Sequence, residues 1–517
     1  MFAHNLGYDA RISDCFLTLP SLGWALVAHN VAPRGTWLSW RRDRATLLMV
    51  DSASVWPDTL AHLGVMFGLG KPRLPSPEAS EVEWERRCQA DVLILRTAVM
   101  AYLAWIEDAD LGNFQVTGAG MAWAAFRHRW LRHNLLVHAD PDALAAERRA
   151  MWTGRCEAYW RGTIGYQVVH EWDLHAAYAR VARDAAVPVR LVGPMPPGYP
   201  WRSALADPRL ALLAEVTVST ATPSVPAHAD GRILWPVGTF TTTLWDVEIQ
   251  AALDDGATVE VRRAWLYHAA PALHDWASWI LDMLSRDDDS VPPWQAAIVK
   301  HWSRALIGRF AMQYSTWERW ATMPALGAER RTMLDDVEGS EYDLMHVGTD
   351  LWRETGLVEW GQSMPAITGY VMAACRVRLW RIVQSLPEGC ALYVDTDSLL
   401  ATDQWHDQIR DLAATDLGEG LRLKQSWRGF TILGPRQIVT GDKVRMAGIP
   451  TRAVRVGRTD FEGEIWESLD VALRSGRPGA VRTMPRRWHA RGVDRRRLGP
   501  GVGWTRPYAL TAGGETS

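Results

Sequence analysis

One short segment constrains this chain more than any other: Ala391-Leu-Tyr-Val-Asp-Thr-Asp-Ser-Leu-Leu400. Two apolar runs of β type flank two carboxylates, which predicts a tight hairpin with Asp395 and Asp397 on one side. Like charges this close repel unless a cation lies between them, and Mg²⁺ prefers hard oxygen ligands of this kind. A bare Asp-x-Asp is more often a solvated turn. The flanking Tyr393 and the order Thr-Asp-Ser make this instance more specific and favour a metal site.

Bulk composition limits the classes of protein to consider. The chain has 517 residues, 48% hydrophobic and 22% charged, which predicts roughly three or four domains of ~150 residues. A net charge of −3 gives no overall sign of nucleic-acid binding, so any basic surface must be local. Five scattered cysteines without Cys-x-x-Cys indicate a reducing compartment and disfavour structural zinc or disulfides. We expect no membrane association, because no apolar run reaches ~18 residues and no signal peptide is evident.

Hydrophobic periodicity divides the rest of the chain into helical and strand-rich regions. Long helices are expected at residues 81–106, 294–312 and 365–386, and a strand-rich insertion at 185–275. Residues 313–362 are polar, and we expect them to be irregular. About fifty residues at the C-terminal end are rich in arginine, and two interpretations stay open for them: a solvated end or a surface that grips duplex DNA.

A third carboxylate is needed if Asp395 and Asp397 build a two-metal centre for phosphoryl transfer. Asp173 is the best candidate, because it ends a β-type run and precedes the helical segment Leu174-His-Ala-Ala-Tyr178. The ring of Tyr178 would then cover the substrate pocket. Taken alone, Asp173 has a simpler interpretation as a helix N-cap.

The helix expected from Trp294 carries a second set of candidate residues. Lys300 and Arg304 are four residues apart and fall on one face, with Gly308 a turn beyond. Two cations there suit a triphosphate, and glycine would let a base pair approach the backbone. The alternative is an amphipathic helix with a solvated basic edge.

Together these motifs resemble the family B DNA polymerases, most closely their protein-primed phage and linear-plasmid branch. Asp173 to Tyr178 is similar to the first palm motif, Lys300 to Gly308 to the fingers-helix motif, and Tyr393 to Ser398 to the third palm motif. The resemblance implies an α+β right-hand polymerase with palm, fingers and thumb. It also implies two Mg²⁺ ions, or Mn²⁺, on Asp173, Asp397 and Asp395, with Tyr178 excluding ribonucleotides.

The N-terminal region resembles the proofreading 3′–5′ exonuclease of the same family, as a partial RNase H-like domain. The implied nuclease residues come from His4-Asn-Leu-Gly-Tyr-Asp9 and two later segments: Asn5, Asp9, Lys71 and Asp91. Further DNA contacts are implied at accessory, linker, palm and thumb motifs: Thr59, Leu60, Gly154, Arg155, Tyr393, Thr396 and Arg436.

Several motifs depart from the family pattern. The fingers Asn-Ser-x-Tyr-Gly reads Arg304-Ala-Leu-Ile-Gly308, and the primer-gripping Lys-x-Tyr reads Arg436-Gln-Ile438, with Lys443 and Arg445 near enough to compensate. The linker Tyr-x-Gly-Gly appears as Trp152-Thr-Gly-Arg155. Arg87 replaces a nuclease tyrosine, and the first nuclease motif, Asp-x-Glu, is not found. Either the start lies upstream or proofreading is lost.

These observations predict the following division of the chain: 1–110 partial exonuclease, 111–165 linker and template-binding region, 166–275 palm with an inserted region, 276–312 fingers, 313–362 second insertion, 363–435 palm, and 436–517 thumb with a basic C-terminal region. The expected partners are primer–template DNA, deoxynucleoside triphosphates and, from the two insertions, a terminal protein primer, in the cytoplasm of a bacterial host. A second interpretation is a degenerate relative that binds primer–template DNA without catalysis. A third, a stand-alone nuclease, is disfavoured by the missing first motif.

Overall fold

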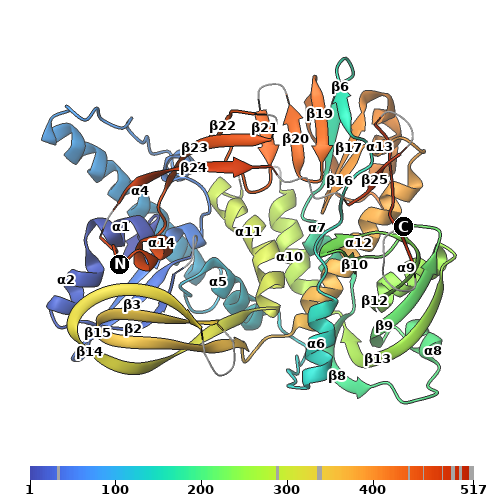
Figure 1. The fold of residues 1–517 in the computed structure, drawn as a ribbon, viewed down its shortest axis with the longest axis horizontal. Coiled ribbons are helices and arrows are strands. Elements are labelled where there is room, and N and C mark those ends of the chain that lie inside the picture. Colours follow the sequence, from blue (N-terminus) through green and yellow to red (C-terminus); the bar gives the residue numbers. More distant parts are fainter. Residues whose placement is uncertain are drawn as a thin grey trace. The chain divides into compact units, whose positions relative to one another are not determined.

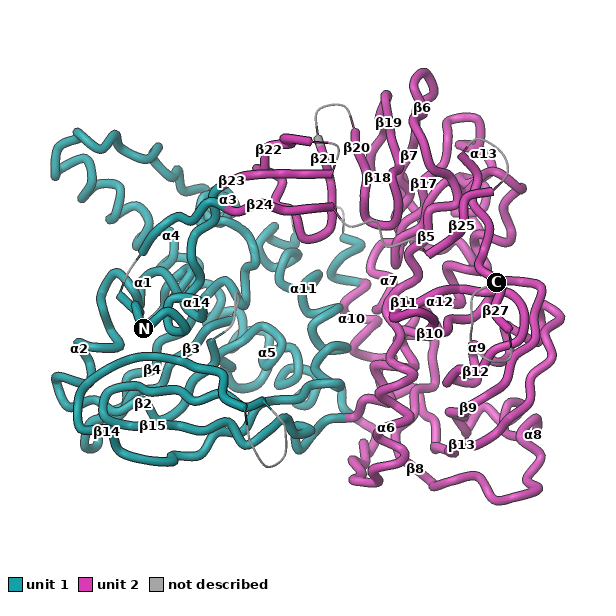
Figure 2. Tube along the Cα trace, in the orientation of Figure 1, with its two compact units in different colours: residues 1–131, 282–363, 464–485 teal, residues 132–281, 364–463, 486–517 magenta. Residues whose placement is uncertain are grey.

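The computed structural model describes residues 1–31, 35–286, 290–334, 341–440, 443–457, 459–479, 481–490, 495–499 and 503–511. Helices and strands are mixed along the chain, which confirms the α+β class (Figure 1). The chain forms two compact units, each built from three separate segments (Figure 2). The first unit contains residues 1–131, 282–363 and 464–485, and the second contains 132–281, 364–463 and 486–517.

A five-stranded sheet lies at the centre of the second unit, in the order β18-β7-β17-β16-β5. Its strands are β5 (Cys156–Ala158), β7 (Val169–Leu174), β16 (Tyr393–Asp395), β17 (Ser398–Thr402) and β18 (Leu421–Trp427). Side chains alternate between its two faces, as strand geometry requires. One face packs into a core with α12 (Pro365–Ser385), through Trp172, Leu174, Val394, Leu399 and Ala401. The opposite face therefore carries the odd-numbered residues of β7, including both of its carboxylates.

The strand-rich insertion predicted at 185–275 is present as a second sheet, in the order β27-β12-β9-β13-β8. Its strands are β8 (Val187–Pro194), β9 (Leu210–Thr220), β12 (Val237–Trp245), β13 (Thr258–Ala270) and β27 (Ala509–Leu510). Short elements accompany it: α8 (Trp201–Ala206), β10 (Ala227–Ala229), β11 (Arg232–Leu234) and α9 (Asp246–Asp254). Arg376 of α12 ties this region to the central sheet, because it pairs with Glu248 of α9 at 2.8 Å and donates to the carbonyl of Trp152 at 2.7 Å.

Smaller elements complete the second unit. The helices are α6 (Pro141–Arg149), α7 (Ala177–Asp184), α10 (His274–Ser285, which continues into the first unit), η3 (Asp403–Trp405) and α13 (His406–Ala413). One four-stranded sheet has the order β21-β20-β19-β6, with β6 (Gly162–Ile164), β19 (Phe430–Gly434), β20 (Gln437–Thr440) and β21 (Lys443–Met446).

The C-terminal part of the chain contains β22 (Val454–Arg455), β23 (Asp460–Trp466), α14 (Leu469–Arg474), β24 (Thr483–His489), β25 (Arg497–Leu498) and β26 (Thr505–Arg506). Several arginines of this basic region pair with carboxylates of their own unit. Arg474 lies 2.9 Å from Asp343, and the buried Arg496 lies 2.9 Å from Glu157. Much of the positive charge is thus used inside the fold, whereas Arg491 lies outside the described residues.

The first unit is built on a four-stranded sheet in the order β1-β4-β3-β2, with β1 parallel to β4. The strands are β1 (Phe2–Ala3), β2 (Ala25–Asn30), β3 (Trp37–Arg42) and β4 (Ala45–Asp51). Around them lie α1 (Leu6–Ile12), α2 (Cys15–Ser21), η1 (Ser52–Ser54), α3 (Leu60–Met66), α4 (Glu81–Asp108), α5 (Gly118–Ala125), η2 (Phe126–Trp130) and α11 (Pro293–Phe310).

The helices predicted at 81–106 and 294–312 are confirmed as α4 and α11. A capping box formed by Ser80 and Glu83 starts α4. Its C-terminal half packs by aromatic contacts, with Tyr102 against Trp56 and Trp105 against Trp302 of α11. By length and composition alone α4 would also suffice to cross a membrane, a test that core helices pass as well.

The expectation that residues 313–362 are irregular is wrong. They form a long antiparallel hairpin of β14 (Gln313–Leu334) and β15 (Glu341–Glu359). The apolar alternation that marks a strand is missing because most of both faces is exposed, and only residues such as Met345 and Val347 reach the core. Cross-strand polar pairs take the place of apolar contacts, as between Arg319 and Asp350 at 2.9 Å.

Candidate active site

Register in the central sheet brings two distant carboxylates onto one face. Asp173 of β7 lies opposite Ser398 of β17, and Ser398 lies opposite Asp395 of β16. Directly opposed residues in a sheet point to the same side. Two strand spacings of ~4.8 Å separate the Asp173 and Asp395 backbones by roughly 10 Å, a distance that two aspartate side chains and a cation can bridge.

Asp397 joins the same edge through the turn that connects β16 to β17. Its amide donates to the carbonyl of Asp395 at 2.7 Å, and its own carbonyl accepts from the amide of Leu174 at 2.7 Å. Because Leu174 follows Asp173 directly, the turn is fixed against the end of β7. The structure thus brings Asp173, Asp395 and Asp397 together at the ends of adjacent strands.

The turn itself is held in an unusual conformation. Thr396 has φ of +63°, a left-handed value that a β-branched residue rarely adopts. The Thr396 amide donates to the carbonyl of Arg155 at 2.7 Å. A Cβ on Gly154 would lie 2.5 Å from the Thr396 hydroxyl oxygen, so only glycine fits there. Gly154, predicted as a DNA contact, packs against the aspartate turn.

Cations compensate the carboxylates of this face. Lys424 of β18 lies 3.3 Å from Asp173 and 3.0 Å from Glu171, and Arg436 lies 3.4 Å from Asp395. Asp395 also accepts hydrogen bonds from the hydroxyls of Tyr393 at 3.3 Å and Thr396 at 3.0 Å. The sequence reasoning missed Glu171 and Lys424. The i, i+2 spacing of Glu171 and Asp173 on one strand would have indicated the first of them.

The donor set suits a hard cation, although the part of the chain that the structure describes holds no group of three or more His, Cys, Asp or Glu arranged to bind a metal. Asp173 and Asp395 each lie against a basic side chain instead. Aspartate oxygens on one face fit Mg²⁺ chemically, and Lys424 and Arg436 would have to move aside for it. The residues present therefore fit the implied metal, in an arrangement now neutralised by side chains.

A cavity of about 320 Å³ opens beside Asp395 in the second unit. Its walls include the rings of Trp427 and Phe430 and the side chain of Ile438, with Arg436 and Arg445 as cations. Arg436 sits in a turn with φ of +56°, and its amide donates to the Tyr393 hydroxyl at 2.9 Å. A cationic, aromatic cavity next to the carboxylates suits the end of a nucleic-acid strand.

Two of the predicted DNA contacts are corrected by burial. The Arg155 side chain is fully buried, pairs with Glu157 at 2.6 Å and stacks on Trp380 at 4.1 Å. Tyr393 is 3% exposed, and its hydroxyl is occupied by the Arg436 amide, Asp395 and the Cys156 thiol. Both side chains support the aspartate turn from inside rather than reaching DNA.

The interpretation of Asp173 as a helix N-cap is wrong, because α7 begins three residues after Leu174 with Ala176 as its N-cap. Asp173 instead belongs to β7, and its side chain does not cap α7. Tyr178 lies in the first turn of α7 and is partly buried.

Lys300, Arg304 and Gly308 belong to the first unit, on α11. All three are exposed, as expected for residues on one face of a helix, while Trp302, Leu306 and Phe310 are buried on the other. The exposed basic face that the sequence predicts is thus present.

The nuclease-like residues of the first unit form a small carboxylate cluster. Asn5 has φ of +81°, and its amide donates to Asp51 at 3.0 Å. Burial raises the pKa of Asp9 to about 6, with further contributions from the charges of Asp51 and Asp91. The sequence reasoning missed Asp51. Its position at the end of the apolar run of β4 is the one sequence feature that would have pointed to it.

Basic side chains neutralise Asp91 in this cluster. Lys71 lies 3.1 Å from Asp91, and Arg87, in the position where the family has tyrosine, also pairs with it. Thr59 caps α3 by accepting from the His62 amide at 3.2 Å, and Leu60 is the first residue of that helix.

No protein-family model and no curated protein matches the chain at a significant level. Solved structures do match. Phi29 DNA polymerase complexed with primer–template DNA has a TM-score of 0.65 and 13% identity, over 94% of this chain and 90% of that one. Phi29 DNA polymerase complexed with primer–template DNA and incoming nucleotides has a TM-score of 0.66 and 13% identity, over 95% and 90%. The chain therefore has the fold of Phi29 DNA polymerase, which confirms the architecture expected from its resemblance to family B polymerases.

Proposed function

We propose that this chain is a template-directed DNA polymerase that adds deoxynucleotides to a 3′-hydroxyl. The observation that carries the proposal is the register of Asp173, Ser398 and Asp395, with Asp397 fixed at the same edge by Leu174. The fold is that of a polymerase whose structures include primer–template DNA and incoming nucleotides.

The reaction is in-line attack of the primer hydroxyl on the α-phosphate of a deoxynucleoside triphosphate. The new phosphodiester bond replaces the bond to the β-phosphate, pyrophosphate leaves, and the hydroxyl proton passes to solvent. Two Mg²⁺ ions, or Mn²⁺, would supply charge neutralisation at the attacking and leaving oxygens. Asp173 and Asp397 are the ligands that we assign to them, with Asp395 assisting. Thr396 and Tyr393 orient Asp395, because their hydroxyls donate hydrogen bonds to its carboxylate.

Several side chains are assigned to substrate binding. Lys300 and Arg304 present two cations on the exposed face of α11, which suits the triphosphate. Tyr178 is assigned the exclusion of ribonucleotides through a clash with their 2′-hydroxyl. The primer end would occupy the cavity beside Asp395, where Arg436 keeps the positive charge of the family's lysine and Trp427 and Phe430 supply rings.

Charge-removing variants test the assignment. Asp395→Asn and Asp397→Asn keep the size of each side chain, and each should abolish primer extension while leaving the melting temperature within a few degrees of wild type. Asp411→Asn, an exposed residue of α13, is the matched control and should extend primers normally. Full extension by either catalytic variant would refute the polymerase proposal.

Protein priming and strand displacement are a finer part of the proposal. Its support is the resemblance to the protein-primed branch, which carries two extra regions. We assign those regions to the strand-rich insertion at 185–275 and to the β14–β15 hairpin. We place this replication in the cytoplasm of a bacterial host. Synthesis begun on a cognate terminal protein would support protein priming, and initiation from oligonucleotides alone would count against it.

A second candidate, primer–template binding without catalysis, is favoured by one observation. Lys424 and Arg436 already neutralise Asp173 and Asp395, and a protein that never binds metal would retain such pairs. A gel shift combined with nucleotide incorporation separates the two functions. DNA binding with no incorporation at any Mg²⁺ or Mn²⁺ concentration would support the non-catalytic candidate.

A further inference from the structure

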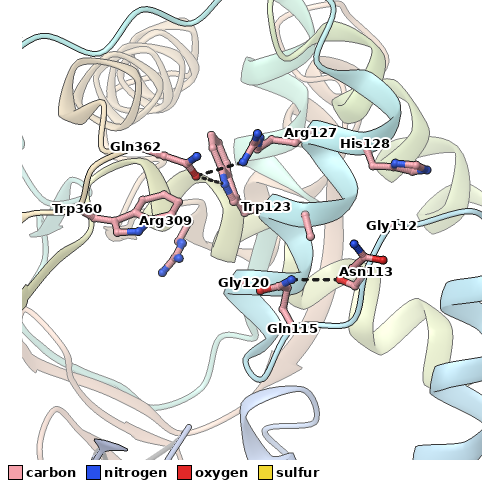
Figure 3. Close-up of a pocket in the computed structure, with 11 residues that line it drawn as sticks. Gly112, Asn113, Gln115, Gly120, Trp123, Arg127, His128, Arg309, Trp360 and Gln362 are labelled. Atoms are coloured by element: carbon pink, nitrogen blue, oxygen red, sulfur yellow. Dashed lines mark hydrogen bonds between the residues drawn. The ribbon is translucent and has the colours of Figure 1, made fainter. Parts of the chain in front are cut away.

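A second cavity, of about 480 Å³, lies within the first unit, and none of the carboxylates discussed above lines it (Figure 3). Three stretches of chain line it. Trp123 and Arg127 come from α5 and η2, Arg309 from the end of α11, and Trp360 and Gln362 from the residues that follow β15. Its volume falls in the range typical of sites for small ligands.

Hydrogen bonds and ring contacts fix the walls of this cavity. The side-chain oxygen of Gln362 accepts from the Trp123 indole at 2.9 Å and from Arg127 at 3.4 Å, as Figure 3 shows. The Arg309 guanidinium lies 3.9 Å from the centre of the Trp360 ring. The Arg127 guanidinium lies 5.9 Å from the centre of the Trp123 ring, so each arginine of the wall has an indole beside it.

The charge of the cavity is one-sided. No Asp or Glu lines it, and no carboxylate within the described ranges pairs with Arg127 or Arg309. His128, also on the wall, pairs with Asp110 at 2.6 Å. The Arg309 Nε is buried without a hydrogen-bond partner, and burial lowers the pKa of this guanidinium. Another nitrogen of this guanidinium, Nη1, donates to the Met312 sulfur. Because two guanidiniums and no carboxylate line the cavity, an anion is the ligand whose charge would complement it.

Helix geometry separates this cavity from the basic face assigned to the triphosphate. Arg309 follows Lys300 by nine residues, which at ~100° per residue places the two side chains on opposite sides of α11. Lys300 and Arg304 are exposed on their side, whereas Arg309 turns towards Trp360. The two basic groups therefore face different surroundings.

We propose that this cavity binds one phosphate-bearing nucleotide unit, with its phosphate on Arg309 and Arg127 and its base against the Trp123 and Trp360 indoles. The amides of Asn113 and Gln115 line the opposite wall, within reach of a base edge. The unit belongs either to a single DNA strand or to a free nucleotide, since both offer the same chemistry. The proposal rests on the proposed polymerase function only for its choice of deoxynucleotides.

Photo-crosslinking tests the site directly. The probes are a short oligonucleotide carrying 5-iododeoxyuridine and the free 5-iododeoxyuridine monophosphate, each applied to the full chain with Asp395→Asn so that no extension occurs. We expect a crosslink to the peptide containing Trp123 or Trp360. Crosslinking by the oligonucleotide alone assigns the site to a strand, and crosslinking by both probes shows that a free nucleotide suffices.

Arginine variants supply the second measurement. Arg309→Gln and Arg127→Gln should each weaken probe binding about tenfold and reduce the salt dependence by about one counterion. Arg44→Gln, an exposed arginine of the same unit, is the matched control and should change neither. Arg127 is exposed, so Arg127→Gln should fold. It tests the cavity on its own if Arg309→Gln fails to fold.

Two results would overturn the site: wild-type probe affinity in both arginine variants, or crosslinks that map elsewhere on the chain. Primer extension by the otherwise unaltered protein is measured separately. Primer extension without probe binding would refute the cavity proposal alone. Probe binding without primer extension would refute the polymerase proposal alone.

Discussion

Gly154→Ala offers a sharp test of how the aspartate turn is supported. The added Cβ would lie 2.5, 2.8 and 2.9 Å from the hydroxyl oxygen, Cγ2 and Cβ of Thr396. Ordinary contacts between such atoms are ~3.5–4 Å, so the turn would have to shift by about 1 Å. Overpacking of this kind costs about 1–3 kcal/mol of folding stability.

The effect on catalysis should exceed the effect on stability. A displacement of about 1 Å at a reacting group lowers the rate by about a hundredfold, and the turn carries Asp397 and borders Asp395. We therefore expect incorporation of a single nucleotide, measured in single turnover, to slow by roughly two orders of magnitude while the protein stays folded. Gly165→Ala is the control, because a Cβ there meets nothing within 4 Å.

A double variant makes the reasoning refutable in a second way. Thr396→Gly removes the atoms that clash and suits the left-handed φ of +63°. Gly154→Ala combined with Thr396→Gly should then recover stability relative to Gly154→Ala alone, giving a favourable coupling free energy. Wild-type incorporation by Gly154→Ala, or no coupling between the two substitutions, would show that the close approach does not position the aspartates.

Three further predictions concern charged groups. Lys424→Gln should lower the Mg²⁺ concentration for half-maximal extension a few-fold, because the ammonium 3.3 Å from Asp173 no longer competes, and a Mg²⁺ titration of extension checks this. Since burial, Asp51 and Asp91 raise the pKa of Asp9 to about 6, ionising Asp9 costs stability as pH rises from about 4 to 6. The melting temperature of Asp9→Asn relative to wild type should rise over that interval, and a constant difference would contradict the raised pKa. Lys300→Gln should increase the KM for deoxynucleotides several-fold with little change in stability, as steady-state kinetics and thermal melts would show.

The sequence predicts those parts of the fold in which local pattern and tertiary context agree. The helix of residues 365–385 is amphipathic only weakly, yet its length and its proline at N1 identify it. The hairpin at Tyr393–Ser398 is also predictable from local pattern, because two apolar runs joined by a two-residue turn favour a hairpin in any packing environment.

Failures of prediction fall where a tertiary contact decides the structure. The β14–β15 hairpin has polar side chains on both faces, so the period-two signal that marks a half-buried strand is absent. Asp51 and Lys424 join their sites through residues more than forty positions away. No local rule identifies such partners.

The same core that folds the central sheet also sets the geometry of the carboxylates. Leu399 and Ala401 must face α12, and Leu400 must face the opposite core with Tyr393, so β17 has one register that satisfies both. In that register Ser398 lies between Asp173 and Asp395. A slip of one residue would turn the leucines of β17 to the wrong faces and would pair Asp173 with a residue whose side chain points away from Asp395. The packing of these two cores therefore sets the register that places the acidic groups.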